Sequence, residues 1–400
     1  MKSCDVAIVG AGIVGLATAW QLMQRFPRAR IIVLEKAAEV AAHQSGHNSG
    51  VMHSGIYYKP GSLKAENCRL GKLAMEEFCT RQNIPFELCG KVIVAVDSSE
   101  LPRLQNIYER GQANGVDCRL IGSEELKELE PHARGVAAIH VARAGIVDYA
   151  QVCRRLAELL QAAGHELLLK TDVRQIDRDG ARIRMGTSSE PVECRFLITC
   201  GGLWADRLIR LSGERPVAPI VPFRGEFFEL KPQAYSLCRN LIYPVPDPAY
   251  PFLGVHFTRT IAGKVECGPN AVLAFARNGY QKTDLNLHDL LGTLGYVGFQ
   301  RMVLRNWKTG LGELWRSWNK AAFVRALQRL VPEIQASDLV PAPSGVRAQA
   351  LGADGTLVDD FVIQRTDNMV HVGNAPSPAA TASLQIGRHI ADQLNGCGLE

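Results

Sequence analysis

The chain has 400 residues, a hydrophobic content of 46%, a charged content of 21% and a formal net charge of +5. These values are typical of a globular protein, and the length predicts two domains. The small positive charge argues against nucleic-acid binding but suits an anionic substrate or an anionic membrane surface. No apolar run reaches the roughly 18 residues of a membrane span, and the N-terminus does not read as a signal peptide. We therefore expect a soluble or peripheral protein.

The 11 cysteines are scattered and include no CxxC pair. This spacing argues against a zinc site or a redox dithiol, and no metal site is predicted. The cysteines are expected to be free thiols in a reducing, cytoplasmic compartment.

The first predicted unit is a strand, a glycine turn, a helix, a second strand and an acid. The apolar run VAIV leads into GAGIVG, with Gly10, Gly12 and Gly15, and the run IIVLE ends at Glu35. Gly10 permits the tight turn, Gly12 lets the backbone approach a pyrophosphate, and Gly15 lets the helix pack closely on the strand. The helix N-terminus attracts phosphates.

Glu35 is placed to accept hydrogen bonds from ribose hydroxyls. No arginine follows it, which argues against a 2′-phosphate and hence against NADP. FAD and NAD both remain, and a purely structural glycine turn is the alternative interpretation.

A polar, glycine-rich loop covers residues 43–62, and a loop of this length inside a domain is usually functional. His53 within it titrates near neutral pH and can accept a proton from an alcohol. Tyr57 and Lys59 are candidates to line the same cleft. The alternatives are a surface histidine and a tyrosine that only packs.

Further along the chain, periodicity predicts the remaining elements. Helices are expected at 63–81, 101–114, 151–163 and 299–330, strands at 91–97, 135–141 and 166–176, and mostly antiparallel sheet at 216–275. Two more units, RFLITCGGLWADRL and GNAPSPAATASL, each read as a strand, a turn and a helix, and the second helix is expected to start near Ala379. Gly201 and Gly373 end these strands, where ligands meet an α/β sheet, although an ordinary tight turn is equally possible.

Two polar residues stand out in the second half of the chain. His256 lies in the apolar segment PFLGVHFTR, and Arg347 follows a turn in PSGVRAQA. An arginine there suits a carboxylate, which a guanidinium binds through two hydrogen bonds. A core histidine and a surface ion pair are the alternatives.

The segment 299–320 has apolar residues at helical spacing on one face, including Trp307, Trp315 and Trp318, and mostly basic residues on the other. This pattern is typical of an interfacial helix. The alternative is a helix docked on the protein's own core. Gly310 and Gly312 weaken any helix here.

With these segments together, the chain resembles the FAD-dependent oxidoreductases of the D-amino-acid oxidase and glycine oxidase superfamily, and within it the L-2-hydroxyglutarate dehydrogenases (also called oxidases). General flavoprotein segments are DVAIVGAGIVGLATA and VLEK; more specific ones are HNSGVMHSGIYYKPGSLKA, VPFRGEFFEL, LGVHFTR, SGVRAQ and NAPSPAATASLQIG. The resemblance covers essentially the whole length.

The resemblance implies a Rossmann-type FAD-binding domain with an inserted antiparallel-sheet substrate domain, as in p-hydroxybenzoate hydroxylase, and a non-covalent FAD. In some dimethylglycine-type relatives, a histidine in the loop matching His53 carries the flavin covalently. The predicted FAD domain comprises 1–85, 145–215 and 345–400, and the substrate domain comprises 86–144 and 216–344. The cofactor residues are expected to be Gly10, Gly12, Ile13, Val14, Gly15, Glu35, Lys36, Ser45, Asn48, Ser49, Val173, Gly201, Trp204, Asn374, Ala375, Pro376, Ser377, Pro378 and Ala379.

The implied reaction is oxidation of L-2-hydroxyglutarate to 2-oxoglutarate, with hydride transfer from C2 to flavin N5. We expect His53 or His256 to take the hydroxyl proton and Arg347 to hold a carboxylate. The resemblance also implies a membrane quinone as electron acceptor, which fits a peripheral position on the inner face of the cell membrane. The rival hypotheses are a glycine or sarcosine type of amine oxidase and a flavin-binding module without turnover.

Overall fold

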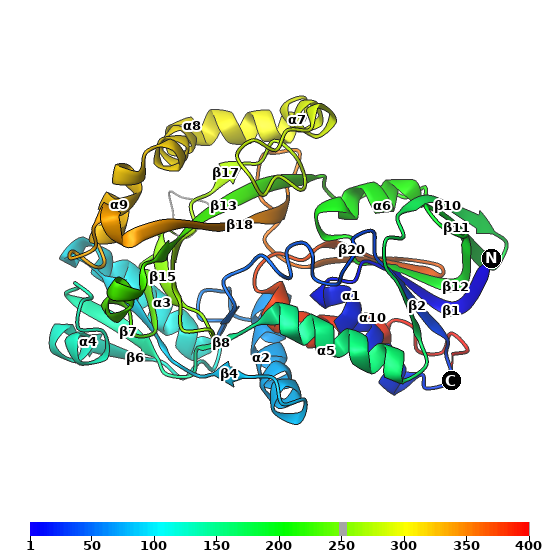
Figure 1. Ribbon diagram of the computed structural model, residues 1–400, viewed down its shortest axis with the longest axis horizontal. Coiled ribbons are helices and arrows are strands. Elements are labelled where there is room, and N and C mark those ends of the chain that lie inside the picture. The colour runs from blue at the N-terminus through cyan, green and yellow to red at the C-terminus, as the bar shows by residue number, and fades with distance from the viewer. Residues whose placement is uncertain (248–253, 400) are drawn as a thin grey trace.

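The computed structural model describes residues 1–247 and 254–399, and it is built on two large sheets (Figure 1). In the first sheet, β1 lies between β12 and β2 and runs parallel to both. The last four residues of β1 are buried, as expected for an apolar strand of a covered parallel sheet. The eight strands of this sheet are β1 (Lys2–Val9), β2 (Ile31–Leu34), β9 (Glu166–Leu168), β10 (Val173–Asp179), β11 (Arg182–Thr187), β12 (Val192–Thr199), β19 (Val362–Thr366) and β20 (Met369–Asn374).

Helices from distant parts of the chain share one apolar core with this sheet. They are α1 (Ile13–Arg25), α2 (Leu63–Arg81), α5 (Tyr149–Ala162) and α10 (Ala379–Asp392), while α6 (Ala205–Leu211) follows β12. Small residues let these helices approach closely: a Cβ on Gly387 of α10 would lie 2.7 Å from the Ala17 carbonyl oxygen of α1. Figure 1 shows α1, α5 and α10 gathered together.

The second sheet has nine strands and is mixed rather than purely antiparallel, because β14 runs parallel to β5. Its two longest strands, β13 and β18, pair antiparallel along most of their length. The strands are β5 (Lys91–Ala95), β6 (Arg119–Gly122), β7 (Ala137–Val141), β13 (Ile220–Leu230), β14 (Leu241–Pro244), β15 (His256–Arg259), β16 (Val265–Gly268), β17 (Val272–Leu273) and β18 (Leu339–Ala350).

Smaller elements complete the chain. A three-stranded sheet contains β3 (Val51–Met52), β8 (Gly145–Val147) and β4 (Phe86–Glu87). The other α-helices are α3 (Leu101–Ala113), α4 (Ser123–Leu129), α7 (Leu287–Leu294), α8 (Val297–Trp318) and α9 (Lys320–Gln328). The short 3-10 helices are η1 (Ser98–Glu100), η2 (Gly202–Trp204), η3 (Pro232–Leu237) and η4 (Ala336–Asp338).

Helices α7 and α8 run along the upper edge of Figure 1, beyond β13, β17 and β18. Of the 22 residues of α8, only Gly298 and Phe299 are fully buried. Its non-helical residue is Asn306, so the predicted weak points Gly310 and Gly312 stay helical. Within residues 1–247 and 254–399, no helix is both long and apolar enough to cross a bilayer.

The predicted fold class is confirmed, and two details of the predicted secondary structure are corrected. The predicted strand pair at 166–176 forms two strands that pair with different neighbours, β9 with β2 and β10 with β11. The predicted helix at 299–330 divides at Asn319, whose side chain caps α9 by accepting a hydrogen bond from the Ala322 N–H. The positions 248–253 of the predicted antiparallel region lie outside the described residues, and the domain boundaries stay a prediction.

Candidate active site and cofactor site

The glycine turn lies between β1 and α1, and its three glycines differ in what they do. Gly10 has a φ of +109°, and a Cβ on it would lie 2.4 Å from the Cys200 carbonyl oxygen. A Cβ on Gly15 would lie 2.0 Å from the Gly10 carbonyl oxygen. These two glycines are required by the fold. A Cβ on Gly12 would meet only the Ser45 Oγ, at 3.2 Å, so the fold alone does not demand glycine there.

The acid at the end of β2 closes the same turn. The Glu35 carboxylate is buried and accepts hydrogen bonds from the N–H groups of Ala11 (2.8 Å) and Ala37 (2.9 Å). The Glu35 carbonyl oxygen accepts from the Thr171 N–H, two residues before Val173. The carboxylate is therefore held beside the N-terminus of α1.

Lys36 and Trp204 lie together, with the Lys36 ammonium 3.9 Å from the Trp204 ring centroid. Burial lowers the pKa of Lys36 to about 8. Trp204 ends η2, which follows Gly201 at the end of β12. The second glycine unit therefore meets the first one at this lysine.

The loop at residues 43–62 reaches the same helix N-terminus. The Ser45 Oγ accepts a hydrogen bond from the Ile13 N–H at 2.8 Å. The Asn48 side chain donates to the carbonyl oxygens of Gln44 and Ser45, which holds the loop in shape, and Ser49 next to it is half-buried. The predicted cofactor residues of this loop therefore lie next to the glycine turn.

The C-terminal unit approaches the loop from the other end. Helix α10 begins at Ala379 as predicted, after residues 374–378. The Asn374 side-chain NH₂ donates to the carbonyl oxygens of Val358 and Asp360 at 2.9 Å, and its Oδ1 is buried without a partner among the described residues. In the first turn of α10, the Thr381 Oγ1 accepts a hydrogen bond from the His53 N–H at 3.1 Å.

His256 is the first residue of β15, and its ring has a defined orientation. The His256 Nδ1 lies 2.8 Å from the Gly254 carbonyl oxygen. Because a carbonyl only accepts hydrogen bonds, the proton sits on Nδ1 and the lone pair remains on Nε2. The ring also packs on Tyr243, with 4.0 Å between the ring centroids.

Both candidate histidines are neutral at neutral pH. Burial lowers the pKa of His53 to about 3 and that of His256 to about 4. Positive neighbours add to the effect: Lys91 lowers the pKa of both rings, and Arg347 lowers that of His256. The two histidines therefore share one electropositive environment, and each is able to accept a proton.

Arg347 lies on β18 and donates a hydrogen bond to the Asn270 carbonyl oxygen at 3.3 Å. Burial lowers its pKa to about 10, so it stays charged. Lys91 begins β5 and lies between two tyrosines, with its Nζ 4.7 Å from the Tyr57 ring centroid and 4.9 Å from the Tyr243 ring centroid. The structure thus brings Lys91 to the site, whereas the predicted Lys59 is exposed.

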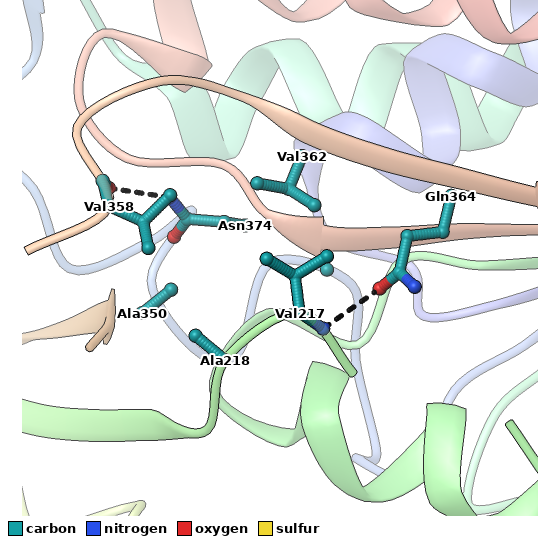
Figure 2. Close-up of a pocket in the computed structure, with 8 residues that line it drawn as sticks. Val217, Ala218, Ala350, Val358, Val362, Gln364 and Asn374 are labelled. Atoms are coloured by element: carbon teal, nitrogen blue, oxygen red, sulfur yellow. Dashed lines mark hydrogen bonds between the residues drawn. The ribbon is translucent and has the colours of Figure 1, made fainter. Parts of the chain in front are cut away.

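A separate shallow hollow, too narrow to hold a ligand, lies next to Asn374, and Figure 2 shows the side chains that line it. Its lining consists of Val217, Ala218, Ala350, Val358, Val362, Gln364, Gly373 and Asn374. None of these side chains is charged, so the hollow does not suit an anionic substrate. The cluster of His53, His256, Lys91 and Arg347 is the better candidate, because charge and proton acceptors meet there.

A family model described as FAD dependent oxidoreductase matches residues 5–393. The chain belongs to this family. Curated relatives named L-2-hydroxyglutarate dehydrogenase are similar over nearly their whole length. The one from Indibacter alkaliphilus is 49% identical, covering 97% of this chain and 98% of the relative, and the Homo sapiens mitochondrial one is 45% identical, covering 98% and 89%.

Solved structures support the fold of this flavoprotein. An L-alpha-glycerophosphate oxidase from Mycoplasma pneumoniae with FAD bound has a TM-score of 0.82 at 23% identity, covering 99% of this chain and 95% of that chain. A glycine oxidase from Geobacillus kaustophilus has a TM-score of 0.73 at 18% identity, covering 98% and 94%. At these identities, the likeness concerns the fold alone.

The residues of the flavoprotein fit FAD. Gly12 is a glycine that the fold does not require, at the N-terminus of a helix, where a side chain would meet a bound pyrophosphate. The unpartnered Asn374 Oδ1 lies just before α10, in the loop predicted to contact the flavin. Both features are explained by a cofactor that extends from the glycine turn to the loop before α10.

Lys91 is a site residue that was not predicted from the sequence. In GKVIVAVD it reads as an ordinary polar residue at the start of an apolar strand. Its position arises from strand pairing, because β5 pairs with β14, which carries Tyr243, and β14 pairs with β15, which carries His256. The sequence carries only a weak signal, since Lys91 lies between Gly90 and the apolar run VIVAV.

Proposed function

We propose that this flavoprotein oxidises L-2-hydroxyglutarate to 2-oxoglutarate. The names of the relatives at 45–49% identity support this substrate. The observation that carries the proposal is a neutral, buried His256 with its lone pair on Nε2, in the same environment as the half-buried Arg347 guanidinium. A 2-hydroxy acid needs both groups, a proton acceptor for its hydroxyl and a cation for its carboxylate.

FAD, when bound, accepts the hydride that leaves C2 of the substrate. The N–H groups at the start of α1 would hold its pyrophosphate, Glu35 would hold a ribose, and residues 374–379 would contact the ring. Glu35 is already oriented for this role by the Ala11 and Ala37 N–H groups.

The chain's own residues bind the substrate and move its hydroxyl proton. Arg347 forms two hydrogen bonds to a carboxylate, because a carboxylate taken out of water is costly without a charged partner. The His256 Nε2 takes the hydroxyl proton as the C2 hydrogen departs. The resulting imidazolium keeps its Nδ1 hydrogen bond to the Gly254 carbonyl oxygen, which stabilises the charged ring.

The test is an anaerobic reduction of the purified holoenzyme. L-2-hydroxyglutarate should bleach the visible absorbance of the oxidised flavin, whereas glycine and sarcosine should leave it unchanged. Bleaching by glycine or sarcosine instead would make the protein an amine oxidase. No bleaching by any of the three would indicate a flavin-binding module without turnover.

We also propose that the surface of α7 and α8 binds an anionic membrane, in a peripheral position on the inner face of the cell membrane. Large apolar side chains project into solvent there, including Leu291, Leu304, Trp315 and Trp318. Exposed basic residues accompany them on α8, namely Arg301, Arg305 and Lys308. An exposed apolar face next to basic side chains fits a bilayer with anionic headgroups.

The two acidic residues of α7 and α8 themselves support the same proposal, because both face the protein. Glu313 is the only acid of α8, and its carboxylate accepts hydrogen bonds from the Ala271 N–H (3.1 Å) and from Arg316. Asp289 of α7 is buried and pairs with Arg207. Neither carboxylate would repel anionic lipid.

A membrane position would suit a quinone as electron acceptor. Reduced enzyme bound to vesicles that contain ubiquinone should be reoxidised faster than reduced enzyme in buffer saturated with oxygen. Faster reoxidation by oxygen would contradict the quinone proposal.

A further inference from the structure

Three lysines of this chain are almost completely buried: Lys64 and Lys72, each 7% exposed, and Lys91, 2% exposed. Two of them have a carboxylate partner. The Lys64 Nζ lies 2.7 Å from the Asp359 Oδ1, and the Lys72 ammonium pairs with Glu76. Lys91 has no carboxylate partner among residues 1–247 and 254–399, and segment 248–253 contains no acidic residue.

Among the described residues, the groups next to Lys91 include two aromatic rings and a neutral thiol. Its Nζ lies over the Tyr57 and Tyr243 rings. The nearby Cys68 thiol donates to the His53 carbonyl oxygen, and burial raises its pKa to about 12, so it stays neutral. The Tyr57 hydroxyl is buried and has no partner in the described part of the chain.

A buried ammonium without a counter-charge is costly, and an anionic ligand would supply the missing charge. Two cations of the site, the buried Lys91 and the half-buried Arg347, act on the proposed base His256. The Lys91 Nζ lies 4.9 Å from the Tyr243 ring centroid, and the His256 ring packs on the same tyrosine at 4.0 Å. Arg347 is the main charge acting on His256, and Lys91 is the main charge acting on His53. A ligand with two carboxylates would therefore meet one cation near His256 and the other towards His53.

We propose that Lys91 binds the carboxylate remote from the reacting carbon, and thereby selects five-carbon 2-hydroxy dicarboxylic acids over monocarboxylic ones. The Tyr57 hydroxyl is placed to donate a further hydrogen bond to that carboxylate. This role rests on the proposed function, since it assigns the second charge of the same substrate. Arg347 holds the carboxylate next to the hydroxyl.

The test compares two unreactive ligands that differ in one charge. Glutarate has two carboxylates, and pentanoate has a methyl group in place of one of them. Their dissociation constants are measured from the change in flavin absorbance of the holoenzyme and by calorimetry. Lys91→Met should weaken glutarate binding about 10- to 100-fold, the effect of losing a hydrogen bond to a charged group, and leave pentanoate binding unchanged.

Lys72→Met is the matched control, because it removes another buried lysine, 7% exposed, that already has a carboxylate partner. It should leave the ratio of the glutarate and pentanoate constants unchanged. An unchanged ratio in Lys91→Met as well would overturn the proposal.

A pH series provides a second test that does not depend on the stability of the methionine variant. Burial lowers the pKa of Lys91 to about 8, so glutarate binding should weaken as the pH rises above 8 and the ammonium loses its proton. The neighbouring groups titrate elsewhere: His53 near 3, His256 near 4, Arg347 near 10 and Cys68 near 12, and the pKa values of Tyr57 and Tyr243 are raised, so the loss expected between pH 8 and 9 belongs to Lys91. Lys91→Arg should remove this pH dependence, and a wild type without it would contradict the proposal.

The same preparations distinguish this proposal from the proposed function. If L-2-hydroxyglutarate fails to reduce the wild-type flavin while the preference for glutarate depends on Lys91, the oxidation proposal fails and the dicarboxylate site stands. If reduction is normal and the preference does not depend on Lys91, only the role of Lys91 is overturned.

Discussion

Helices α10 and α8 are both amphipathic, yet they lie in opposite environments. Helix α10 buries eight of its 14 residues against its neighbours, whereas α8 buries two of its 22. Trp315 and Trp318 of α8 are 60% and 75% exposed. An amphipathic pattern therefore predicts a helix and its apolar face, but not the surface that this face contacts.

The side chains of the two helices explain the difference. Helix α10 has small residues at its contacts, and Gly71 of α2 and Gly387 let the backbones of α2 and α1 approach it closely. Helix α8 has bulky tryptophans and leucines, with Gly310 and Gly312 open to solvent. The surface of α10 suits tight packing around a cofactor, whereas the surface of α8 suits a fluid, apolar partner such as a bilayer.

The largest effect is expected from a substitution in the predicted cofactor site. Gly12→Val should abolish FAD binding and all activity, because its side chain would occupy the place of the pyrophosphate. The variant should still fold, since a Cβ there meets only the Ser45 Oγ at 3.2 Å. FAD released on heating and a thermal melt measure both properties.

Gly310→Val is the matched control for this substitution, because a Cβ on Gly310 meets nothing within 4 Å, and it should retain FAD. Full FAD occupancy in Gly12→Val would contradict the placement. Flavin that stays with the precipitated wild type would show a covalent link, and His53 would be the first position to examine.

The next effect concerns the proposed base, His256, on β15 of the second sheet. His256→Gln should lower kcat/KM by about 10²- to 10⁴-fold, the usual contribution of general base catalysis. The pKa of His256 is lowered to about 4, and the base must be neutral, so wild-type kcat/KM should fall as the pH drops through about 4. This acid limb should vanish in the variant. A normal His256→Gln beside an inactive His53→Gln would move the base to His53.

A smaller effect is expected at the carboxylate. Arg347→Lys keeps the charge but loses the planar pair of donors, so KM for L-2-hydroxyglutarate should rise about 10-fold, the loss of one hydrogen bond to a charged group. Arg174→Lys, on the exposed side of β10, is the control and should leave KM unchanged. An unchanged KM in Arg347→Lys would place the carboxylate elsewhere.

The smallest effect on catalysis is expected from substitutions in α8. These substitutions test the comparison between α8 and α10 most directly. Replacing Trp307, Trp315 and Trp318 with serine should abolish binding to anionic vesicles without changing the thermal melt. Phe299→Ser should leave vesicle binding unchanged but lower the free energy of unfolding by about 3 kcal/mol, because the Phe299 side chain is only 7% exposed. Sedimentation with vesicles and thermal melts measure both.

The dependence of vesicle binding on salt concentration provides a further test. Each basic residue near an anionic surface contributes about 1 kcal/mol, so wild-type binding should weaken in high salt. A wild type that does not bind vesicles at low salt would end the membrane proposal.

Much of the fold was predictable because its signals are local. The glycine turn, Glu35 and the start of α10 at Ala379 each depend on a few consecutive residues. Other features depend on distant pairing and were not predictable. Lys91 is buried by strands that carry Tyr243 and His256, and the strands at 166–176 are separated by their different neighbours.

The central claim is that this flavoprotein removes a hydride and a proton from L-2-hydroxyglutarate. The most direct measurement is an anaerobic titration of the wild-type holoenzyme with L-2-hydroxyglutarate, followed by identification of the product. We expect one molecule of L-2-hydroxyglutarate to bleach one flavin and to yield one molecule of 2-oxoglutarate, while the D-enantiomer has no effect. An oxidised flavin after excess L-2-hydroxyglutarate, or bleaching without 2-oxoglutarate, would contradict the account.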